Sequence, residues 1–213
     1  IGTDDEVGER MIADRRLPLI SATGSCAMGR HVGQVVAGRL GKCLLELGGN
    51  NAVIVEPDAD LDLALKSIVL GAVGTAGQRC TSTRRVIVHE SVADELVSRM
   101  AKAYSTLTLG APLAEGTLVG PVIGQRTVDA YLDAIAQAKD QGGTVVAGGE
   151  AASPDGLDGT FVQPAIVRAP ASKELPIAMD ETFAPICYVF TYRDLDEAIA
   201  MQNSVDQGLS SAI

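Results

Sequence analysis

A short stretch near the start of the chain changes twice between the apolar pattern of a strand and that of a helix. Residues 17–22 form a short apolar run, residues 27–39 repeat their apolar positions with a helical period, and residues 43–47 form a second apolar run. Ser25 precedes the helical segment as a capping residue, and Gly41 follows it as a terminator. Because a strand, a helix and a strand in this order join two parallel strands, the pattern predicts a βαβ unit and an α/β fold.

The rest of the chain continues this alternation without an internal repeat. Further strands are predicted over residues 52–55, 85–88, 144–147, 161–167 and 186–191. Helices are predicted over residues 4–13, 61–76, 91–107, 128–141 and 195–202. Residues 85–88 also fit a restarted helix, and either Asp58 or Asp60 caps the helix that begins at Leu61. Residues 110–124 are rich in Pro and Gly and predict a loop.

The best domain boundary is the Gly-Gly pair that follows Leu47, where the βαβ unit ends and a second α/β unit begins. The boundary divides the chain into residues 1–47 and residues 48–213. The chain opens without Met inside a predicted helix and stops as an apolar strand begins. We therefore expect it to be a piece of a longer protein.

The composition excludes several classes of function. The chain has 17 basic and 27 acidic residues, and this surplus of acid argues against a nucleic-acid partner. The longest apolar stretch, residues 68–73, is far shorter than the roughly 20 residues that cross a bilayer, which excludes a membrane span. The four cysteines lack paired short spacing, which predicts neither disulfides nor a zinc site and indicates a cytoplasmic protein. His31 and His89 lack partners at ligand spacing, so no metal site is expected.

Cys80 is the strongest candidate for a nucleophile. Small and flexible residues precede it from Gly74 to Gly77, and they allow a substrate to approach the sulfur closely. The adjacent cationic Arg79 favours the thiolate, which is the reactive form of cysteine. The alternative is a buried structural cysteine, which is the more frequent kind.

Glu46 is the only acid in the apolar strand 43–47, and it lies at the carboxyl end of that strand. Ligands of open parallel sheets bind at this end, where a partly desolvated carboxylate can serve as a general base. The alternative is a carboxylate that points into water. Gly24 and Ser25 precede a helix in the manner of a phosphate-binding turn, although ordinary capping by Ser25 explains the same residues.

Three runs, taken together, resemble the NAD(P)-dependent aldehyde dehydrogenase superfamily. They are residues 45–51 (Leu-Glu-Leu-Gly-Gly-Asn-Asn), residues 77–80 (Gly-Gln-Arg-Cys) and residues 181–185 (Glu-Thr-Phe-Ala-Pro). Their order and spacing are similar to that family throughout the 213 residues. The Asn-Asn pair, the Gln-Arg before Cys80, and Ala184 in place of the usual Gly resemble the branch that oxidises α-aminoadipate semialdehyde in lysine breakdown.

The resemblance implies a fold and a reaction. Residues 1–47 would be the C-terminal part of a Rossmann-like cofactor domain, and residues 48–213 most of the catalytic α/β domain. Cys80 would attack the aldehyde, giving a thiohemiacetal and then a thioester, and Glu46 would be the general base of thioester hydrolysis. The residues implied at the cofactor are Gly24, Ser25, Leu47, Glu181 and Phe183. NAD+ is the expected cofactor, with NADP+ left open, a small aldehyde is the expected partner, and the full-length protein is expected to be a homodimer or homotetramer.

Arg79 is a candidate substrate-binding residue, because its guanidinium could bind the carboxylate of a short substrate in bidentate fashion. The alternative is that it acts on the thiol or pairs with a structural acid. A non-catalytic scaffold of the same fold is the alternative function, although packing would require neither Cys80 nor Glu46. Glu46 also disfavours a relative that passes the acyl group to coenzyme A. We expect the 213 residues alone to be inactive, because several cofactor contacts of the family lie outside them.

Overall fold

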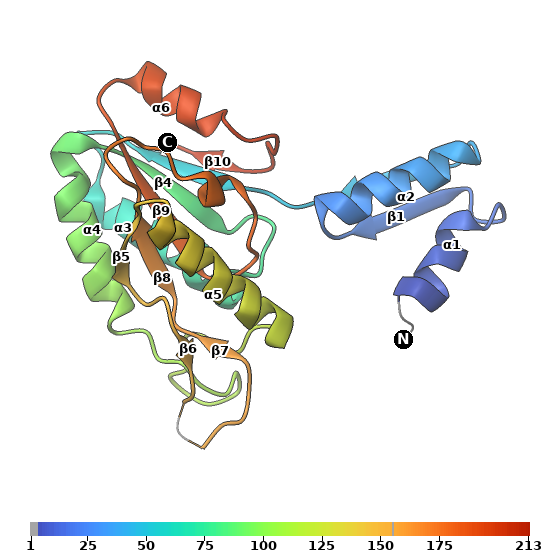
Figure 1. Cartoon of the computed structure of the whole chain (residues 1–213), viewed down its shortest axis with the longest axis horizontal. Coiled ribbons are helices and arrows are strands. Elements are labelled where there is room, and N and C mark those ends of the chain that lie inside the picture. Colours follow the sequence, from blue (N-terminus) through green and yellow to red (C-terminus); the bar gives the residue numbers. More distant parts are fainter. Residues whose placement is uncertain (1–3, 155) are drawn as a thin grey trace. The chain divides into compact units, whose positions relative to one another are not determined.

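The computed structural model describes residues 4–154 and 156–213 of the chain (Figure 1). These residues form two compact units, which are Ile1–Gly48, hereafter unit 1, and Gly49–Ile213, hereafter unit 2. None of the described helices is both long enough and apolar enough to span a membrane.

Unit 1 contains the βαβ unit that the sequence predicts. A π-helical turn, η1 (Asp4–Gly8), leads into helix α1 (Glu9–Ala13). Strand β1 (Leu19–Thr23), helix α2 (Cys26–Gly38) and strand β2 (Lys42–Glu46) follow, and the two strands pair in parallel. The buried core of this unit consists of Ile12, Ile20, Val32 and Val36. The prediction of parallel strands joined by a helix is confirmed.

The two ends of α2 are closed by different means. The Ser25 hydroxyl accepts a hydrogen bond from the Met28 amide at 3.1 Å, as the capping prediction requires. At the other end, the Gly41 amide donates to the Val36 carbonyl at 2.9 Å. The left-handed position falls on Leu40, with a φ of 60°, rather than on Gly41. Gly41 therefore ends the helix through its amide.

Unit 2 is built on a six-stranded sheet. Its strands are β3 (Asn51–Val55), β4 (Thr83–His89), β5 (Thr144–Ala147), β8 (Ala165–Arg168), β9 (Ile186–Tyr192) and β10 (Ser211–Ala212). Their order across the sheet is β10-β3-β4-β9-β8-β5. The paired strands are parallel except for β5, which runs antiparallel to β8. Residues 85–88 thus belong to a strand, which decides the alternative left open by the sequence.

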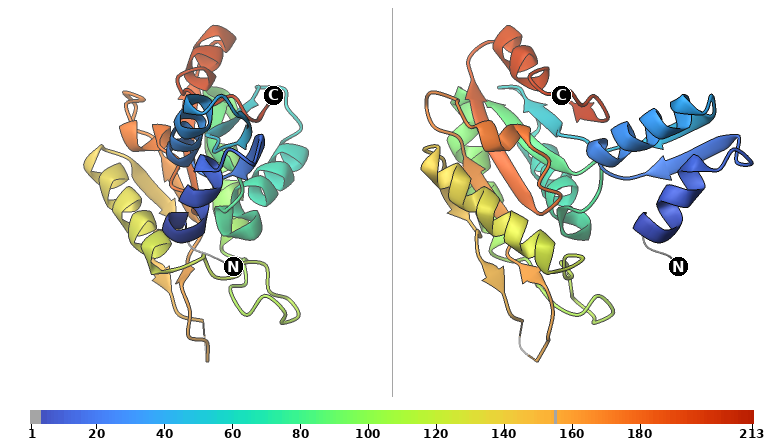
Figure 2. Two further views of the ribbon diagram at one scale, coloured as in Figure 1. Left: turned by 90° about the vertical axis from the view of Figure 1, so that its right-hand side faces the viewer. Right: turned by 45° about the vertical axis from the view of Figure 1, so that its right-hand side comes forward.

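Helices cover both faces of this sheet (Figure 2). They are α3 (Leu61–Val73), α4 (Glu90–Tyr104), α5 (Gln125–Asp140) and α6 (Leu195–Gln202). Val86 and Val88 of β4 belong to the main core with residues of α3 and α4, whereas Ile87 belongs to a smaller core with Ala198 of α6. This division follows from the alternation of side chains along a strand. Asp60 is the residue that caps α3, since its carboxylate accepts from the amides of Asp62 and Leu63.

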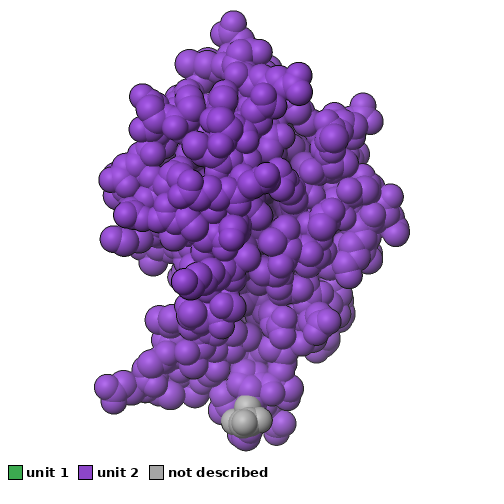
Figure 3. Space-filling view, turned by 90° about the vertical axis from the view of Figure 1, so that its left-hand side faces the viewer, with its two compact units in different colours: residues 1–48 green, residues 49–213 purple. Residues whose placement is uncertain are grey.

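Several predicted elements have other bounds in the structure; the predicted helix 91–107, for example, ends at Tyr104. The predicted strand 161–167 is two strands, β7 (Phe161–Val162) and β8, because Pro164 between them has no amide to donate to a ladder. Strand β7 pairs with β6 (Ala151–Ala152), and this pair projects from the body of unit 2 (Figure 1), one face of whose surface is shown in Figure 3. The predicted helix 61–76 ends at Val73 and is followed by a 3₁₀ turn, η2 (Gly74–Gly77). The short 3₁₀ turn η3 (Pro176–Met179) was not predicted.

Candidate active site

The candidate nucleophile lies at one edge of the sheet in unit 2. Cys80 is in the turn that leads from η2 into the amino end of β4. Residues 49–51 lead into β3, and residues 181–185 lead into β9, and these two strands flank β4. Because the three strands are parallel, the segments that precede them lie at the same edge of the sheet. The structure therefore brings together the part of the first run that lies in unit 2 and the other two runs of the predicted motif.

Hydrogen bonds join these segments. The Asn51 amide group donates to the carbonyls of Cys80 at 2.7 Å and of Ser82 at 2.8 Å. The Gly49 amide donates to Oε1 of Glu181 at 3.1 Å. A Cβ on Gly49 would lie 2.6 Å from the Cys80 carbonyl oxygen, so only glycine permits this approach. The backbone of Cys80 is thus held by the neighbouring strand.

The four cysteines differ in accessibility. Cys80 is free and partly exposed, as a nucleophile must be. Cys187 is buried in β9, and burial raises the pKa of its thiol to about 12. In unit 1, Cys43 is exposed and Cys26 is partly exposed. Within unit 2, Cys80 is therefore the thiol that a solvent-borne substrate can reach.

The turn before Cys80 packs directly on the segment before β9. Gly77 has a φ of 68°, and a Cβ built there would lie 2.5 Å from the Ala184 carbonyl carbon. The same atom would lie 2.6 Å from Cα of Pro185. Two segments about a hundred residues apart in sequence are therefore in backbone contact beside the thiol.

The Arg79 side chain is hydrogen-bonded to the end of helix α3. Its Nη2 donates to the Leu70 carbonyl at 3.0 Å, in the last turn of α3. The guanidinium lies against Gly74, where a Cβ would be 2.5 Å from Nη2. The Leu70 carbonyl also accepts from the amide of Gly74, the C-cap residue of α3, so Arg79 adds a second, cationic donor at the carboxyl end of this helix, where a positive charge is favourable. The predicted role of Arg79 at a substrate carboxylate stays a prediction.

Arg84 is a residue of this site that the sequence reasoning missed. Its side chain is 3% exposed, and it donates to the carbonyls of Gly77 at 3.2 Å, Arg79 at 3.3 Å and Ala184 at 3.3 Å. Its Nη2 also lies 3.5 Å from Oε1 of Glu181. Burial lowers the pKa of Arg84, and the Glu181 carboxylate opposes that shift. The signal in the sequence was a pair of arginines directly before the apolar residues 86–88.

The remaining predicted cofactor residues of unit 1 surround the carboxyl ends of its two strands. The Gly24 amide donates to the Glu46 carbonyl at 3.0 Å. Ser25 caps α2, whose first-turn amides favour an anion. The Glu46 side chain is exposed, so of the two alternatives that the sequence left open the structure has the carboxylate that points into water. Leu47 packs on Gly29, where a Cβ would be 2.4 Å from its Cδ2, so the glycine permits close packing of this residue on α2.

Both histidines have structural partners. His31 lies 2.8 Å from the Glu9 carboxylate. His89 accepts from the Ser91 amide at the start of α4, and its ring meets Tyr192 edge to face. Among the residues that the structure describes, no group of three or more His, Cys, Asp or Glu side chains could hold a metal ion.

Comparison with known proteins identifies the family. All residues from 1 to 213 match the Aldehyde dehydrogenase family. The chain belongs to this family. It is 46% identical over 213 residues to the putative aldehyde dehydrogenase family 7 member A1 homolog of Dictyostelium discoideum, covering 100% of this chain and 41% of that protein. It is also 46% identical over 208 residues to the alpha-aminoadipic semialdehyde dehydrogenase of Bos taurus, covering 98% of this chain and 38% of that protein.

Solved structures of aldehyde dehydrogenases share the fold. The betaine aldehyde dehydrogenase of Staphylococcus aureus, solved in complex with NAD+, matches with a TM-score of 0.95 and 30% sequence identity. The match covers 100% of this chain and 42% of that one. The chain thus spans about two fifths of the length of the aldehyde dehydrogenases it matches. The α/β fold predicted from the sequence is confirmed.

Proposed function

We propose that this chain carries the catalytic thiol and part of the cofactor site of an NAD(P)-dependent aldehyde dehydrogenase that acts on α-aminoadipate semialdehyde. The observation that carries the proposal is the position of Cys80, partly exposed on a turn whose backbone is held by Asn51. The Glu181 segment meets this turn through Gly77 and Arg84. The substrate is supported by the 46% identity to a relative named alpha-aminoadipic semialdehyde dehydrogenase.

The proposed cofactor is NAD+, which is present in a solved relative. When bound, NAD+ would be the oxidant of the reaction. Glu181 and Phe183 would hold the nicotinamide ribose, and Gly24, Ser25 and Leu47 would contact other parts of the cofactor. The described residues fit this role, because the contacts they make with the Glu181 carboxylate use Oε1. Oε2 can therefore accept a hydrogen bond from a ribose hydroxyl.

The residues of this chain would perform two chemical steps. The Cys80 thiolate attacks the aldehyde carbon and forms a carbon–sulfur bond. After the adduct has been oxidised to a thioester, Glu46 takes a proton from water as the water oxygen attacks the thioester carbon. The carbon–sulfur bond then breaks, which releases the carboxylic acid and returns the thiolate of Cys80.

This proposal assigns roles to the two parts of the chain. Residues 1–47 would be the end of the NAD-binding domain, and residues 48–213 the catalytic domain. Arg79 would bind the far carboxylate of the substrate once a substrate is present. The partner would be a small aldehyde, and the full-length protein would form a homodimer or homotetramer, as is usual in the family.

The proposal is tested by comparing Glu46→Gln with the wild-type full-length protein. The variant should release a burst of about one NADH per active site and then stall, because oxidation precedes the step that requires a base. Glu115→Gln, in an exposed loop, is the control and should turn over like the wild type. Normal steady-state turnover by Glu46→Gln would exclude Glu46 as the base. Absence of NADH formation by the wild type with this aldehyde would overturn the proposal as a whole.

A further inference from the structure

We propose that Arg84 is a positioning residue, which holds the Glu181–Phe183 segment and the turn that carries Cys80 in one arrangement. The chemical roles of those two segments rest on the proposed function, whereas the contacts of Arg84 do not. Arg84 itself would touch neither the substrate nor the cofactor. Its effect would be transmitted through the groups it binds.

Because Arg84 is buried, its positive charge must be stabilised by groups of both segments. A guanidinium that is 3% exposed must be compensated by ionic and hydrogen-bond partners, because an unpaired buried charge is strongly destabilising. The partners of Arg84 are the carbonyls of Gly77 and Arg79, which precede Cys80, and groups of the segment that leads into β9. Displacement of either segment would leave part of this charge without a partner. The two segments are therefore coupled through one side chain.

The second segment is held at two of its side chains. Oε1 of Glu181 lies between Nη2 of Arg84 and the amide of Gly49, so the carboxylate is fixed from two directions. The centroid of the Phe183 ring lies 5.5 Å from Cζ of Arg84, within cation–π distance, and Phe183 is 40% exposed. Phe183 also has a φ of 55°, a conformation that a non-glycine residue keeps only when its surroundings hold it there. The pair proposed to meet the nicotinamide ribose is thus positioned by Arg84.

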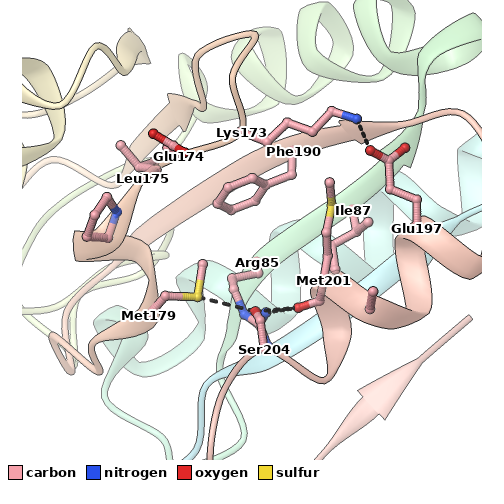
Figure 4. Close-up of a pocket in the computed structure, with 12 residues that line it drawn as sticks. Arg85, Ile87, Lys173, Glu174, Leu175, Met179, Phe190, Glu197, Met201 and Ser204 are labelled. Atoms are coloured by element: carbon pink, nitrogen blue, oxygen red, sulfur yellow. Dashed lines mark hydrogen bonds and ion pairs between the residues drawn. The ribbon is translucent and has the colours of Figure 1, made fainter.

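The adjacent Arg85 provides an internal control. It lies in the same strand and is 1% exposed, but its side chain points to the opposite face of the sheet. There it donates to the carbonyls of Asn50, Met201 and Gln202. It lines a cavity of about 520 Å³ beside α6, which has Phe190 and the Lys173–Glu197 ion pair among its walls (Figure 4). The two arginines are therefore matched in type, strand and burial, and they differ in the groups they bind.

The first experiment measures the arrangement without reference to activity. Hydrogen–deuterium exchange is followed in the full-length protein, without cofactor, for the wild type, Arg84→Met and Arg85→Met. Methionine keeps an unbranched side chain and removes the charge. Arg84→Met should increase exchange in peptides that cover residues 77–82 and residues 181–186, and Arg85→Met should increase it around residues 201–204 instead. Unchanged exchange of both site segments in a folded Arg84→Met protein would overturn the proposal.

The second experiment measures the consequence for the cofactor. Loss of a charge-assisted interaction should raise the KM for NAD+ roughly 10- to 100-fold in Arg84→Met, with a smaller change in kcat. Arg84→Lys keeps the charge but not the fork of donors, and it should recover part of this loss. Arg85→Met should change the KM for NAD+ less than Arg84→Met does, because Arg85 is linked to the site only through the backbone of Asn50. Equal changes for the two methionine variants would show a general effect of burial and overturn the positioning role.

Two outcomes need separate interpretation. If Arg84→Met does not fold, Arg84→Lys becomes the deciding variant, and an unchanged KM for NAD+ together with unchanged exchange would overturn the proposal. If the wild-type protein produces no NADH, the proposed function fails. The exchange measurement still decides whether Arg84 holds the two segments together, because it requires no turnover.

Discussion

Replacement of Gly77 by alanine tests whether the turn before Cys80 is fixed by its contact with the segment before β9. The added Cβ would lie 2.5 Å from the Ala184 carbonyl carbon and 2.6 Å from its oxygen. Ordinary contacts between carbon atoms are about 3.5–4.0 Å, so one of the two backbones must move by about 1 Å. The Ala184 carbonyl accepts from the Ile186 amide at 2.8 Å and from Arg84, and both bonds would be strained by such a shift.

The expected destabilisation has two parts. The left-handed backbone at position 77 costs a residue with a Cβ about 1–2 kcal/mol. Forcing the methyl group into a filled space costs a further 1–3 kcal/mol, approximately. Gly116 isolates the first part, because its φ is 82° and a Cβ there would meet nothing within 4 Å. Gly77→Ala should therefore lose about 1–3 kcal/mol more stability than Gly116→Ala.

Calorimetry on the full-length protein measures this difference. At about 2–4 °C per kcal/mol for a domain of this size, Gly77→Ala should unfold roughly 2–12 °C below Gly116→Ala. The rate at which iodoacetamide modifies Cys80 should also change in Gly77→Ala and remain at the wild-type value in Gly116→Ala. Equal unfolding temperatures and equal alkylation rates for the two variants would refute the packing argument.

The remaining predictions concern reactivity and specificity. With limiting iodoacetamide, Cys80 should be modified before the two cysteines of unit 1, and preferential labelling of either of those would contradict its assignment. Cys187 should stay unmodified up to about pH 10 in the folded protein, because burial keeps its thiol protonated until about pH 12, and mass spectrometry after alkylation at several pH values tests this. Arg79→Ala should lower kcat/KM for α-aminoadipate semialdehyde roughly 10- to 150-fold while leaving propanal nearly unaffected. Equal losses for both aldehydes would instead indicate that Arg79 acts through its bond to Leu70 or on the thiol.

The elements that the sequence predicts best are those with both a clear period and a local end signal. Helix α6 begins at Leu195, directly after the capping residue Asp194, and its predicted bounds agree with the structure. Strand β5 also has its predicted bounds, since Gly142 and Gly143 end the preceding helix. Elements whose ends depend on tertiary partners were predicted less well. The two-residue strand β6 has no periodic pattern of its own and exists only through its pairing with β7.

In the candidate site, too, features that depend on tertiary contacts could not be predicted from the sequence. Three sequence runs were enough to predict that Cys80 and Glu181 belong to one site, and the structure joins their segments through Gly77 and Arg84. The direction of the Arg79 side chain could not be predicted, because its hydrogen-bond acceptor, the Leu70 carbonyl, is brought near it only by the fold. The strand pattern left open whether the Glu46 carboxylate is exposed or partly desolvated, and the structure shows it exposed.

The two units place their candidate residues at opposite ends of their strands. In unit 1, Ser25 and Glu46 lie at the carboxyl ends of β1 and β2, where ligands of parallel sheets usually bind. In unit 2, Cys80 precedes β4 and Glu181 precedes β9, so both residues lie near the amino ends of these strands. A residue that precedes a strand is positioned by the first residues of that strand. Arg84, in the second position of β4, therefore reaches both the Gly77 carbonyl before Cys80 and the Ala184 carbonyl before β9, which explains why a charged side chain occupies this buried strand.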